Sequence, residues 1–197
     1  MPKVAAIILA GGPSSRFGKP KQLAKFRDQT LVRHAARAAI AAGCDHVAVV
    51  VGERAAEIET ELSALACEVA VNHDWREGLA SSIRAGLQHV LTDDHDIELI
   101  LLMACDQPLV DEKGLRELIR TQESTAKPIV ASAYAGTLGI PALFARSVFP
   151  ALLELTGDRG AKELILSRPD DVASFDFPAA AVDVDTAADL EQLTREA

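Results

Sequence analysis

Two kinds of hydrophobic periodicity alternate along the chain and predict an α/β fold. Apolar runs without polar alternation, typical of parallel strands covered on both faces, occupy residues 4–10, 47–51 and 99–103. Apolar residues spaced three and four apart lie between these runs and predict helices. The helical positions are Leu31, Val32, Ala35, Ala36, Ala39 and Ile40; Ile58, Leu62 and Leu65; Leu79, Ile83, Leu87 and Val90; and Leu115, Leu118 and Ile119.

The second half of the chain continues this alternation. It predicts a strand over 129–133 with a hairpin centred on 135–137, and helices over 148–155 and 161–166. A final strand near 181–184 and a closing helix through Leu190 and Leu193 complete the pattern. We therefore expect a doubly wound, three-layer α/β/α sandwich on a mixed, mostly parallel sheet, with residues 1–197 forming one domain.

Charge and cysteine content narrow the class of protein. The formal net charge of −9 argues against nonspecific nucleic-acid binding, because an acidic surface repels phosphates. The three cysteines, Cys44, Cys67 and Cys105, are odd in number and form no C-x-x-C pair, so they indicate neither a disulfide framework nor a zinc site. No export signal opens the sequence and no apolar run is long enough for a membrane span. The expected location is the cytoplasm, with no membrane partner.

The most informative segment follows the first predicted strand. Gly11 and Gly12 leave room for backbone N–H groups to approach phosphate oxygens, and Arg16, Lys19 and Lys21 make this loop locally basic. It is not a Walker A loop, because five residues separate Gly12 from Gly18 and a proline follows Lys19. Nor does it have the G-x-G-x-x-G spacing of a dinucleotide fingerprint. The loop predicts a nucleoside triphosphate site of another kind.

The loop resembles the L-A-x-G-x-S-x-R-x-G-x-x-K signature of the nucleotidyltransferases of molybdenum cofactor synthesis. The matching residues are Leu9, Ala10, Gly12, Ser14, Arg16, Gly18 and Lys21. The segment 72–86 resembles the same family's N-x(5)-G-x-x-x-S-[IL]-x-x-G segment. The chemistry of the loop and the resemblance together imply a set of nucleotide-binding residues: Leu9, Ala10, Gly11, Gly12, Ser14, Arg16, Lys21, Asn72, Gly78 and Ser82.

Two carboxylates are candidate ligands for Mg²⁺. Asp106 follows a buried strand and matches the family's D-x-P motif; the alternative is a cap for the next helix. Asp183 and Asp185 share a face of the expected last strand, and resemblance to the family's D-[IV]-D-T segment favours Asp185. Asp185 has its own alternative as the N-cap of the closing helix. The expected metal ligands are Asp106 and Asp185.

Two further segments resemble those that bind the acceptor in the family. The first is G-x-P-x-x-F, in which Gly139 and Pro141 are the candidate acceptor-binding residues. The second is L-x-G-D-x-G-A-[RK], in which the candidates are Gly157, Asp158 and Gly160. Ile140 stands where the family often has histidine. The resemblance thus spans five ordered segments and implies binding of a phosphorylated acceptor such as molybdopterin.

The implied reaction is Mg²⁺-dependent transfer of a nucleoside monophosphate from a nucleoside triphosphate (NTP), releasing pyrophosphate. The implied catalytic groups are Arg16 on the β- and γ-phosphates, Lys21 near the α-phosphate, and Asp106. An acceptor phosphate is already anionic, so no general base is required, and the sequence offers no histidine–carboxylate pairing to nominate. Several segments favour CTP, whereas the L-A-G-G spelling at Gly11 keeps GTP as an alternative.

Two other functions stay open from the sequence. One is transfer to a different phosphorylated acceptor, such as a sugar or polyol phosphate. The other is a non-catalytic accessory protein that binds molybdenum cofactor and delivers it to a molybdenum hydroxylase. The basic loop argues for the enzyme, because delivery alone needs no triphosphate site.

Overall fold

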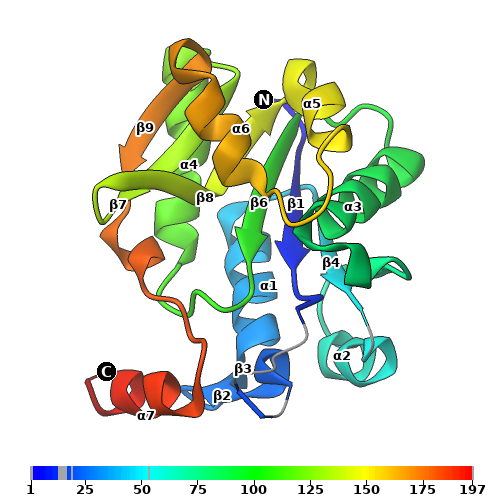
Figure 1. The fold of residues 1–197 in the computed structure, drawn as a ribbon, viewed down its shortest axis with the longest axis vertical. Helices are drawn as coiled ribbons and strands as arrows, with labels where there is room; N and C mark the ends of the chain where they lie inside the picture. The colour runs from blue at the N-terminus through cyan, green and yellow to red at the C-terminus, as the bar shows by residue number, and fades with distance from the viewer. Residues whose placement is uncertain (1, 13–16, 19, 53, 197) are drawn as a thin grey trace.

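A seven-stranded sheet forms the centre of the molecule (Figure 1). The computed structural model describes residues 2–12, 17–18, 20–52 and 54–196. In sheet order the strands are β5 (Glu68–Val71), β4 (His46–Val51), β1 (Val4–Leu9), β6 (Leu99–Ala104), β8 (Thr137–Ala145), β7 (Ile129–Tyr134) and β9 (Val172–Asp176). The first four run parallel, β8 is antiparallel to both neighbours, and β9 is parallel to β7. The prediction of a mixed, mostly parallel sheet is confirmed.

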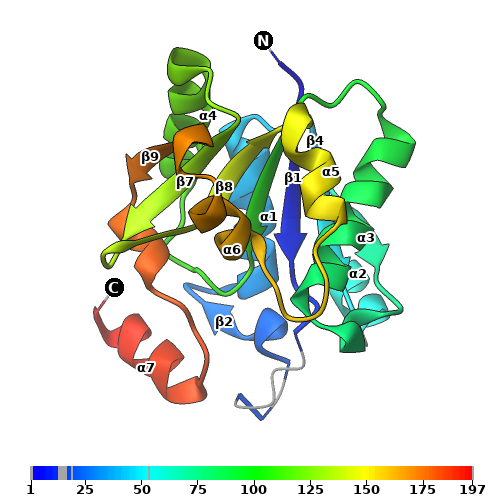
Figure 2. The same ribbon diagram turned by 45° about the horizontal axis from the view of Figure 1, so that its top comes forward.

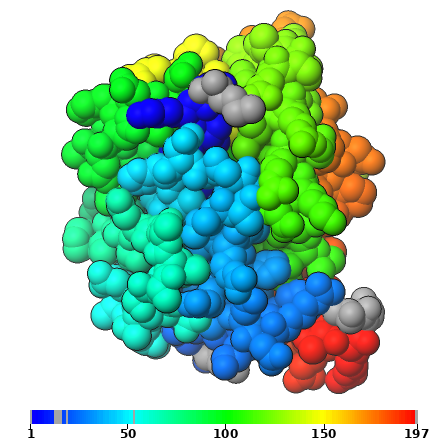
Figure 3. Space-filling view, turned by 180° about the vertical axis from the view of Figure 1, so that it is seen from behind, coloured from blue at the N-terminus to red at the C-terminus, as the bar shows by residue number. Residues whose placement is uncertain are grey.

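Helices cover both faces of this sheet (Figures 1 and 2). On one face lie α1 (Leu31–Ala42), α2 (Ala55–Leu62) and α4 (Glu112–Thr125), which also form much of the surface seen in Figure 3. On the other lie α3 (Leu79–Asp93), α5 (Phe149–Leu153) and α6 (Ala161–Ser167). Successive residues of β1 point to alternate faces, so Ile8 packs in the first layer and Ile7 in the second. This is the expected three-layer sandwich.

A smaller hydrophobic cluster ties the end of the chain to its beginning. The short strands β2 (Lys25–Phe26) and β3 (Gln29–Thr30) form a hairpin that the sequence pattern did not predict. Phe26 is buried in this cluster with Val184, and with Leu193 of the last helix, α7 (Ala187–Glu196). Figure 3 shows α7, in red, beside the blue N-terminal segments. The segment around Asp185 is therefore held next to the first loop.

The strand predicted near 181–184 is wrong. Residues Pro178–Ala181 form a 3₁₀ turn, and the sheet edge beside β7 is taken by the earlier segment β9. Val184 is buried, but against Phe26 rather than in the sheet, and its N–H donates to the Asp106 carbonyl at 2.9 Å. Because residues 182–185 form no strand, the argument that strand alternation puts Asp183 and Asp185 on one face does not apply.

Among the described residues, no helix combines the length and apolarity needed to cross a membrane.

Gly86 permits close packing of α3 on the sheet and provides a stability test. A Cβ there would lie 2.6 Å from Ile7 Cγ2 and 2.7 Å from Val50 Cγ2, both on central strands. We expect Gly86→Ala to lower the free energy of unfolding by about 1–2 kcal/mol, since overpacking outweighs roughly 1 kcal/mol of improved helix propensity. Urea denaturation measures this, with Gln88→Ala on the exposed face of α3 as the control. Equal effects of the two substitutions would contradict the packing argument.

Candidate functional site

A cleft of about 570 Å³ lies where the strand order reverses. β1 and β6 are neighbours, with Leu9 opposite Ala104 at their carboxyl ends, and from them the chain continues toward opposite edges of the sheet, to β4 and to β7. Ligands of doubly wound folds collect at this position. The predicted site residues that line the cleft are Leu9, Ala10, Gly11, Gly12, Lys21, Gly78, Ser82, Asp106 and Asp158.

The glycine loop is held by a side chain that the sequence reasoning missed. The buried Gln22 Nε2 donates to the Ala10 carbonyl at 2.8 Å and to the Gly12 carbonyl at 3.0 Å. These bonds fix the backbone where β1 ends. At Gly11 a Cβ would lie 3.2 Å from Ser82 Oγ, so glycine allows the loop to approach α3. The predicted residues Ser14 and Arg16 lie outside the described part of the chain.

Lys21 joins the two predicted metal ligands. Its Nζ lies 2.5 Å from Asp106 Oδ2 and 3.2 Å from Asp185 Oδ1, although these residues are far apart in sequence. Burial alone would lower the pKa of Lys21, but the two carboxylates raise it above the ordinary value. The ammonium is therefore charged at neutral pH and stands between two carboxylates.

A third carboxylate makes this end of the cleft electronegative. Asp183 reaches the surface, yet partial loss of hydration, followed by the charges of Asp106 and Asp185, raises its pKa to about 6. Three carboxylates thus surround one lysine among the described residues. Such an oxygen-rich, negative site fits a divalent cation. Proteins usually bind Mg²⁺ through one or two carboxylates together with the phosphates of the substrate.

Neither metal-ligand candidate is needed to cap a helix. The N-cap of α4 is Asp111, whose Oδ1 accepts from the Gly114 N–H at 2.9 Å. At the start of α7, Thr186 Oγ1 accepts from the Asp189 N–H, and Asp189 Oδ2 accepts from the Thr186 N–H. The capping alternatives for Asp106 and Asp185 therefore find no support in the structure.

The start of α3 forms one wall of the cleft. Gly78 precedes the helix with φ +111°, and Ser82 lies on its first turns. Asn72 does not line the cleft; it is buried, and its Nδ2 donates to Ser81 Oγ at 2.9 Å and to Ser82 Oγ at 3.0 Å. Asn72 therefore positions Ser82 rather than facing a ligand itself.

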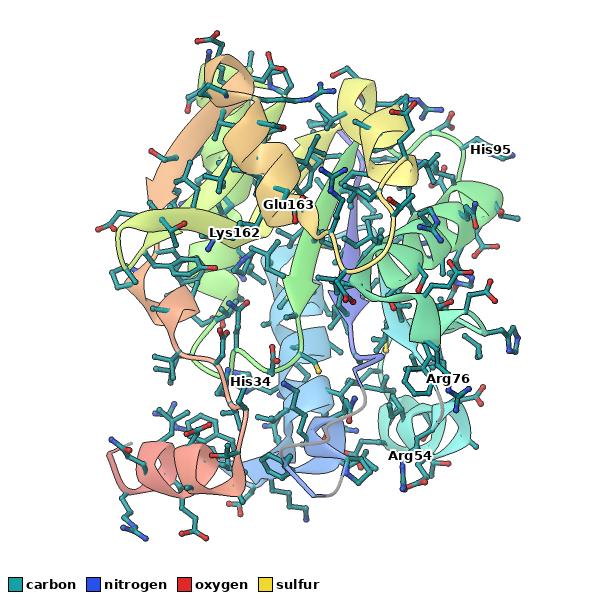
Figure 4. The ribbon with its side chains drawn as sticks, viewed as in Figure 1. His34, Arg54, Arg76, His95, Lys162 and Glu163 are labelled. Carbon is teal, nitrogen blue, oxygen red and sulfur yellow. The ribbon has the colours of Figure 1, made fainter. Side chains whose placement is uncertain are left out.

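Of the predicted acceptor-binding residues near α6, one lines the cleft and the others hold the loop and helix beside it. Asp158 lines the cleft, and the Gly157 carbonyl accepts from the Ala80 N–H at 3.1 Å, so this loop lies against α3. A Cβ on Gly78 would lie 2.5 Å from the Gly157 oxygen, which explains glycine at that contact. Gly160 is the N-cap of α6, the helix that carries Lys162 and Glu163 (Figure 4).

The other acceptor segment contributes a residue that was not among the predicted ones. Gly139 and Pro141 lie on β8 outside the cleft lining, whereas Ile140 between them lines it. The Ile140 carbonyl accepts from Gln107 Nε2 at 3.3 Å and from the Tyr134 hydroxyl at 3.1 Å. β8 is thereby joined to the loop that carries Asp106.

Trp75 and Arg76, both in the 3₁₀ turn Trp75–Glu77, line the outer part of the cleft. The Arg76 guanidinium lies 4.4 Å from the centroid of the Trp75 ring, and Gly52 packs closely against that ring. Figure 4 shows Arg76 at the edge of the molecule, outside the sheet. Trp75 thus serves as a packing anchor and presents its indole to the cleft.

Comparison with known proteins identifies the family to which the chain belongs. The model of the MobA-like NTP transferase domain matches residues 6–172. The chain belongs to the MobA-like NTP transferase family. The match extends from β1 to the start of β9, so it includes the glycine loop, Asp106 and the Gly157–Asp158 loop.

Individual relatives carry several names. Nicotine blue oxidoreductase of Paenarthrobacter nicotinovorans is 29% identical to this chain. The alignment covers 99% of this chain and 97% of the oxidoreductase. A probable molybdenum cofactor guanylyltransferase of Bacillus cereus strain ATCC 10987 is 30% identical over 64% of this chain and 59% of its own length.

The crystal structure of Rv0371c from Mycobacterium tuberculosis H37Rv has a TM-score of 0.84 at 31% identity, covering 98% of each chain. A manganese complex of Rv0371c has a TM-score of 0.81 at 30% identity, covering 99% of this chain and all of the other.

As a member of this family, the protein is a nucleotidyltransferase, and its fold is that of the nucleotide-diphospho-sugar transferases. A transferase of this kind takes an NTP and a phosphorylated acceptor. The cleft supplies a fixed glycine loop, a half-buried lysine and carboxylates at one place, which suits positioning and charge neutralisation around phosphates.

Proposed function

We propose that this protein transfers CMP from CTP to the phosphate of molybdopterin or molybdenum cofactor and releases pyrophosphate. The observation that carries the proposal is the placement of Lys21 between Asp106 and Asp185 at the mouth of the glycine loop. The likeness to relatives named molybdenum cofactor guanylyltransferase supports the acceptor. A molybdenum hydroxylase is the proposed recipient of the product.

The reaction balances without a general base. An oxygen of the acceptor phosphate bonds to the α-phosphorus of the triphosphate, while the bond from that phosphorus to the bridging oxygen of pyrophosphate breaks. Backbone N–H groups at Gly11 and Gly12 and the Lys21 ammonium hold the phosphates in line, with Arg16 proposed on the β- and γ-phosphates. Asp106 and Asp185 would hold Mg²⁺, which would supply further charge neutralisation at the phosphates.

The choice of base rests on opposing observations. The segments 82–84, 157–161 and 183–186 resemble those of cytidylyltransferases, which favours CTP. GTP is the second candidate, because Gly11 follows the guanylyltransferase spelling and a matching relative carries that name. A Cβ on Gly11 would lie 3.2 Å from Ser82 Oγ, so an alanine at this position would crowd the α3 wall of the cleft.

Pyrophosphate release tests the proposal directly. Each of four NTPs is supplied with and without molybdopterin and Mg²⁺, and we expect release only when all are present, fastest with CTP. EDTA should abolish release because no cation then balances the triphosphate. Faster release with GTP would overturn the base choice, and release with sugar or polyol phosphates alone would overturn the acceptor. Failure with every combination would favour the carrier.

The relative named nicotine blue oxidoreductase adds one arm to this experiment. A transferase consumes no reduced dinucleotide, and the loop of this chain lacks the G-x-G-x-x-G spacing that would hold one. Oxidation of reduced nicotinamide dinucleotide in the presence of nicotine blue, without pyrophosphate release, would contradict transfer.

Asp185 and Asp183 provide a matched pair that tests the metal assignment. Asp185 Oδ1 accepts from the Lys21 ammonium at 3.2 Å, while Asp183 lies two residues away in the same segment. We expect Asp185→Asn to lower turnover about 100-fold and to raise the Mg²⁺ concentration needed for half-maximal rate, because a metal ligand is lost. Asp183→Asn should change both by less than about tenfold. The reverse ranking would assign the ligand to Asp183.

A further inference from the structure

Two histidines and two carboxylates meet at the end of the sheet opposite the cleft. They are His46 at the start of β4, Glu68 at the start of β5, and His89 and Asp93 on α3. One ligand atom from each lies within 4.8 Å of those of the other three. Since β4 and β5 run parallel to β1, their first residues lie far from the carboxyl ends that form the cleft.

Strand alternation explains why these side chains converge. His46 precedes Ala48 by two residues, and Ala48 pairs with Glu68, so all three point to the same face of the sheet. That face is the one covered by α3. His89 and Asp93 are four residues apart on α3 and therefore lie one turn apart on one side of the helix.

Glu68 is the centre of the cluster. Its Oε2 lies 2.8 Å from His89 Nε2 and 3.3 Å from His46 Nε2, and His89 Nε2 lies 3.4 Å from Asp93 Oδ2. The His46 Nε2 atom is shielded from solvent and makes no hydrogen bond in the described structure, although Glu68 Oε2 lies 3.3 Å away. A buried imidazole nitrogen without a partner is costly unless something else binds it.

We propose that His46, Glu68, His89 and Asp93 form a binding site for Zn²⁺ or a similar divalent transition-metal ion. Two imidazoles and two carboxylates are N/O donors that such ions prefer, and four ligands complete a closed tetrahedral site. Donor atoms around tetrahedral zinc are roughly 3.3–3.5 Å apart. Three of the six donor separations are 2.8–3.4 Å and all six lie within 4.8 Å, so side-chain adjustments of about an ångström bring the donors around one ion.

The ion would connect three elements at an edge of the molecule. β5 is the edge strand of the sheet, and the ion would attach it to β4 and to the C-terminal part of α3. It would also balance the charge of the two carboxylates. The site is thus structural in kind and separate from the Mg²⁺ site proposed in the cleft.

Zinc titration of the full chain, stripped with EDTA and dialysed, tests this site. We expect one equivalent of Zn²⁺ to bind and to raise the melting temperature, since the ion binds only the folded arrangement. His89→Gln and Asp93→Asn should each weaken zinc binding at least about 100-fold, exceeding the roughly 10- to 100-fold cost of losing an outer partner. Asp93 is largely exposed, so its variant keeps the test valid if His89→Gln folds poorly.

Two controls distinguish this site from zinc binding elsewhere on the chain. His95→Gln alters a histidine that follows the same helix but projects into solvent, and it should leave zinc affinity unchanged (Figure 4). Asp106→Asn should also retain the bound equivalent, because the cleft is at the other end of the sheet. Loss of zinc binding in Asp106→Asn, or unchanged affinity in both His89→Gln and Asp93→Asn, would overturn the proposal. So would the absence of any zinc-induced rise in melting temperature, which would leave Glu68 as an ion-pair partner of the histidines.

Discussion

Asp106→Asn should lower the rate of nucleotidyl transfer by at least about 100-fold without unfolding the protein. The substitution keeps the size of the side chain but removes the negative charge that faces Lys21 and, by proposal, the metal. Loss of one preorganised charge-stabilising group commonly costs roughly 100- to 1,000-fold in turnover. Lys21 retains Asp185 at 3.2 Å, so the ammonium is not left without a counter-charge. Pyrophosphate release at saturating NTP and Mg²⁺ measures the effect, and circular dichroism checks the fold.

The chain offers a matched control for this substitution. Asp94 also pairs with a lysine, since its Oδ2 lies 2.9 Å from Lys3 Nζ, but this exposed pair lies away from the cleft. Asp94→Asn should therefore leave the transfer rate unchanged. Similar losses in both variants would mean that Asp106 acts through general stability rather than through the reaction. A wild-type transfer rate in Asp106→Asn would contradict the proposed mechanism.

The parts of the site that the sequence predicted are those that depend on local patterns. An apolar run followed by Gly11 and Gly12 identifies the end of a central strand, and the same logic applies to Asp106 after the run 99–103. Parallel strands bring such ends to one edge, so the meeting of the glycine loop with Asp106 follows from the fold class. The structure places both in the same cleft.

The parts that could not be predicted depend on contacts between distant segments. Gln22 has no special spacing, because its partners are backbone carbonyls of the loop before it. Val182–Val184 alternates apolar and polar residues like a strand, yet Val184 is buried in the cluster with Phe26. The true edge strand, β9, is only partly buried and carries a weak pattern. The four residues of the proposed zinc site come from three separate elements, so no sequence motif joins them.

Lys21→Met should reduce transfer about 100-fold or more, because it removes the cation expected to act on the α-phosphate while retaining most of the apolar stem. The fold should persist, since the side chain is near the rim of the cleft and its stem packing is largely kept. Lys25→Met, an exposed substitution in the adjoining hairpin, serves as the control and should transfer at the wild-type rate. Lys21→Arg keeps a positive charge but has a different shape, so it should recover only part of the activity.

The response of Lys21→Met to Mg²⁺ separates a catalytic lysine from a structural one. In the wild type the ammonium occupies the space between Asp106 and Asp185, and it must share these carboxylates with any metal ion. Without the ammonium, the two like charges repel each other and a divalent cation gains both ligands. Mg²⁺ should therefore raise the melting temperature of Lys21→Met more than that of the wild type, even as turnover falls. If Lys21 served only to hold the fold, activity and Mg²⁺ stabilisation would fall together, because the carboxylates would no longer be positioned to bind the ion.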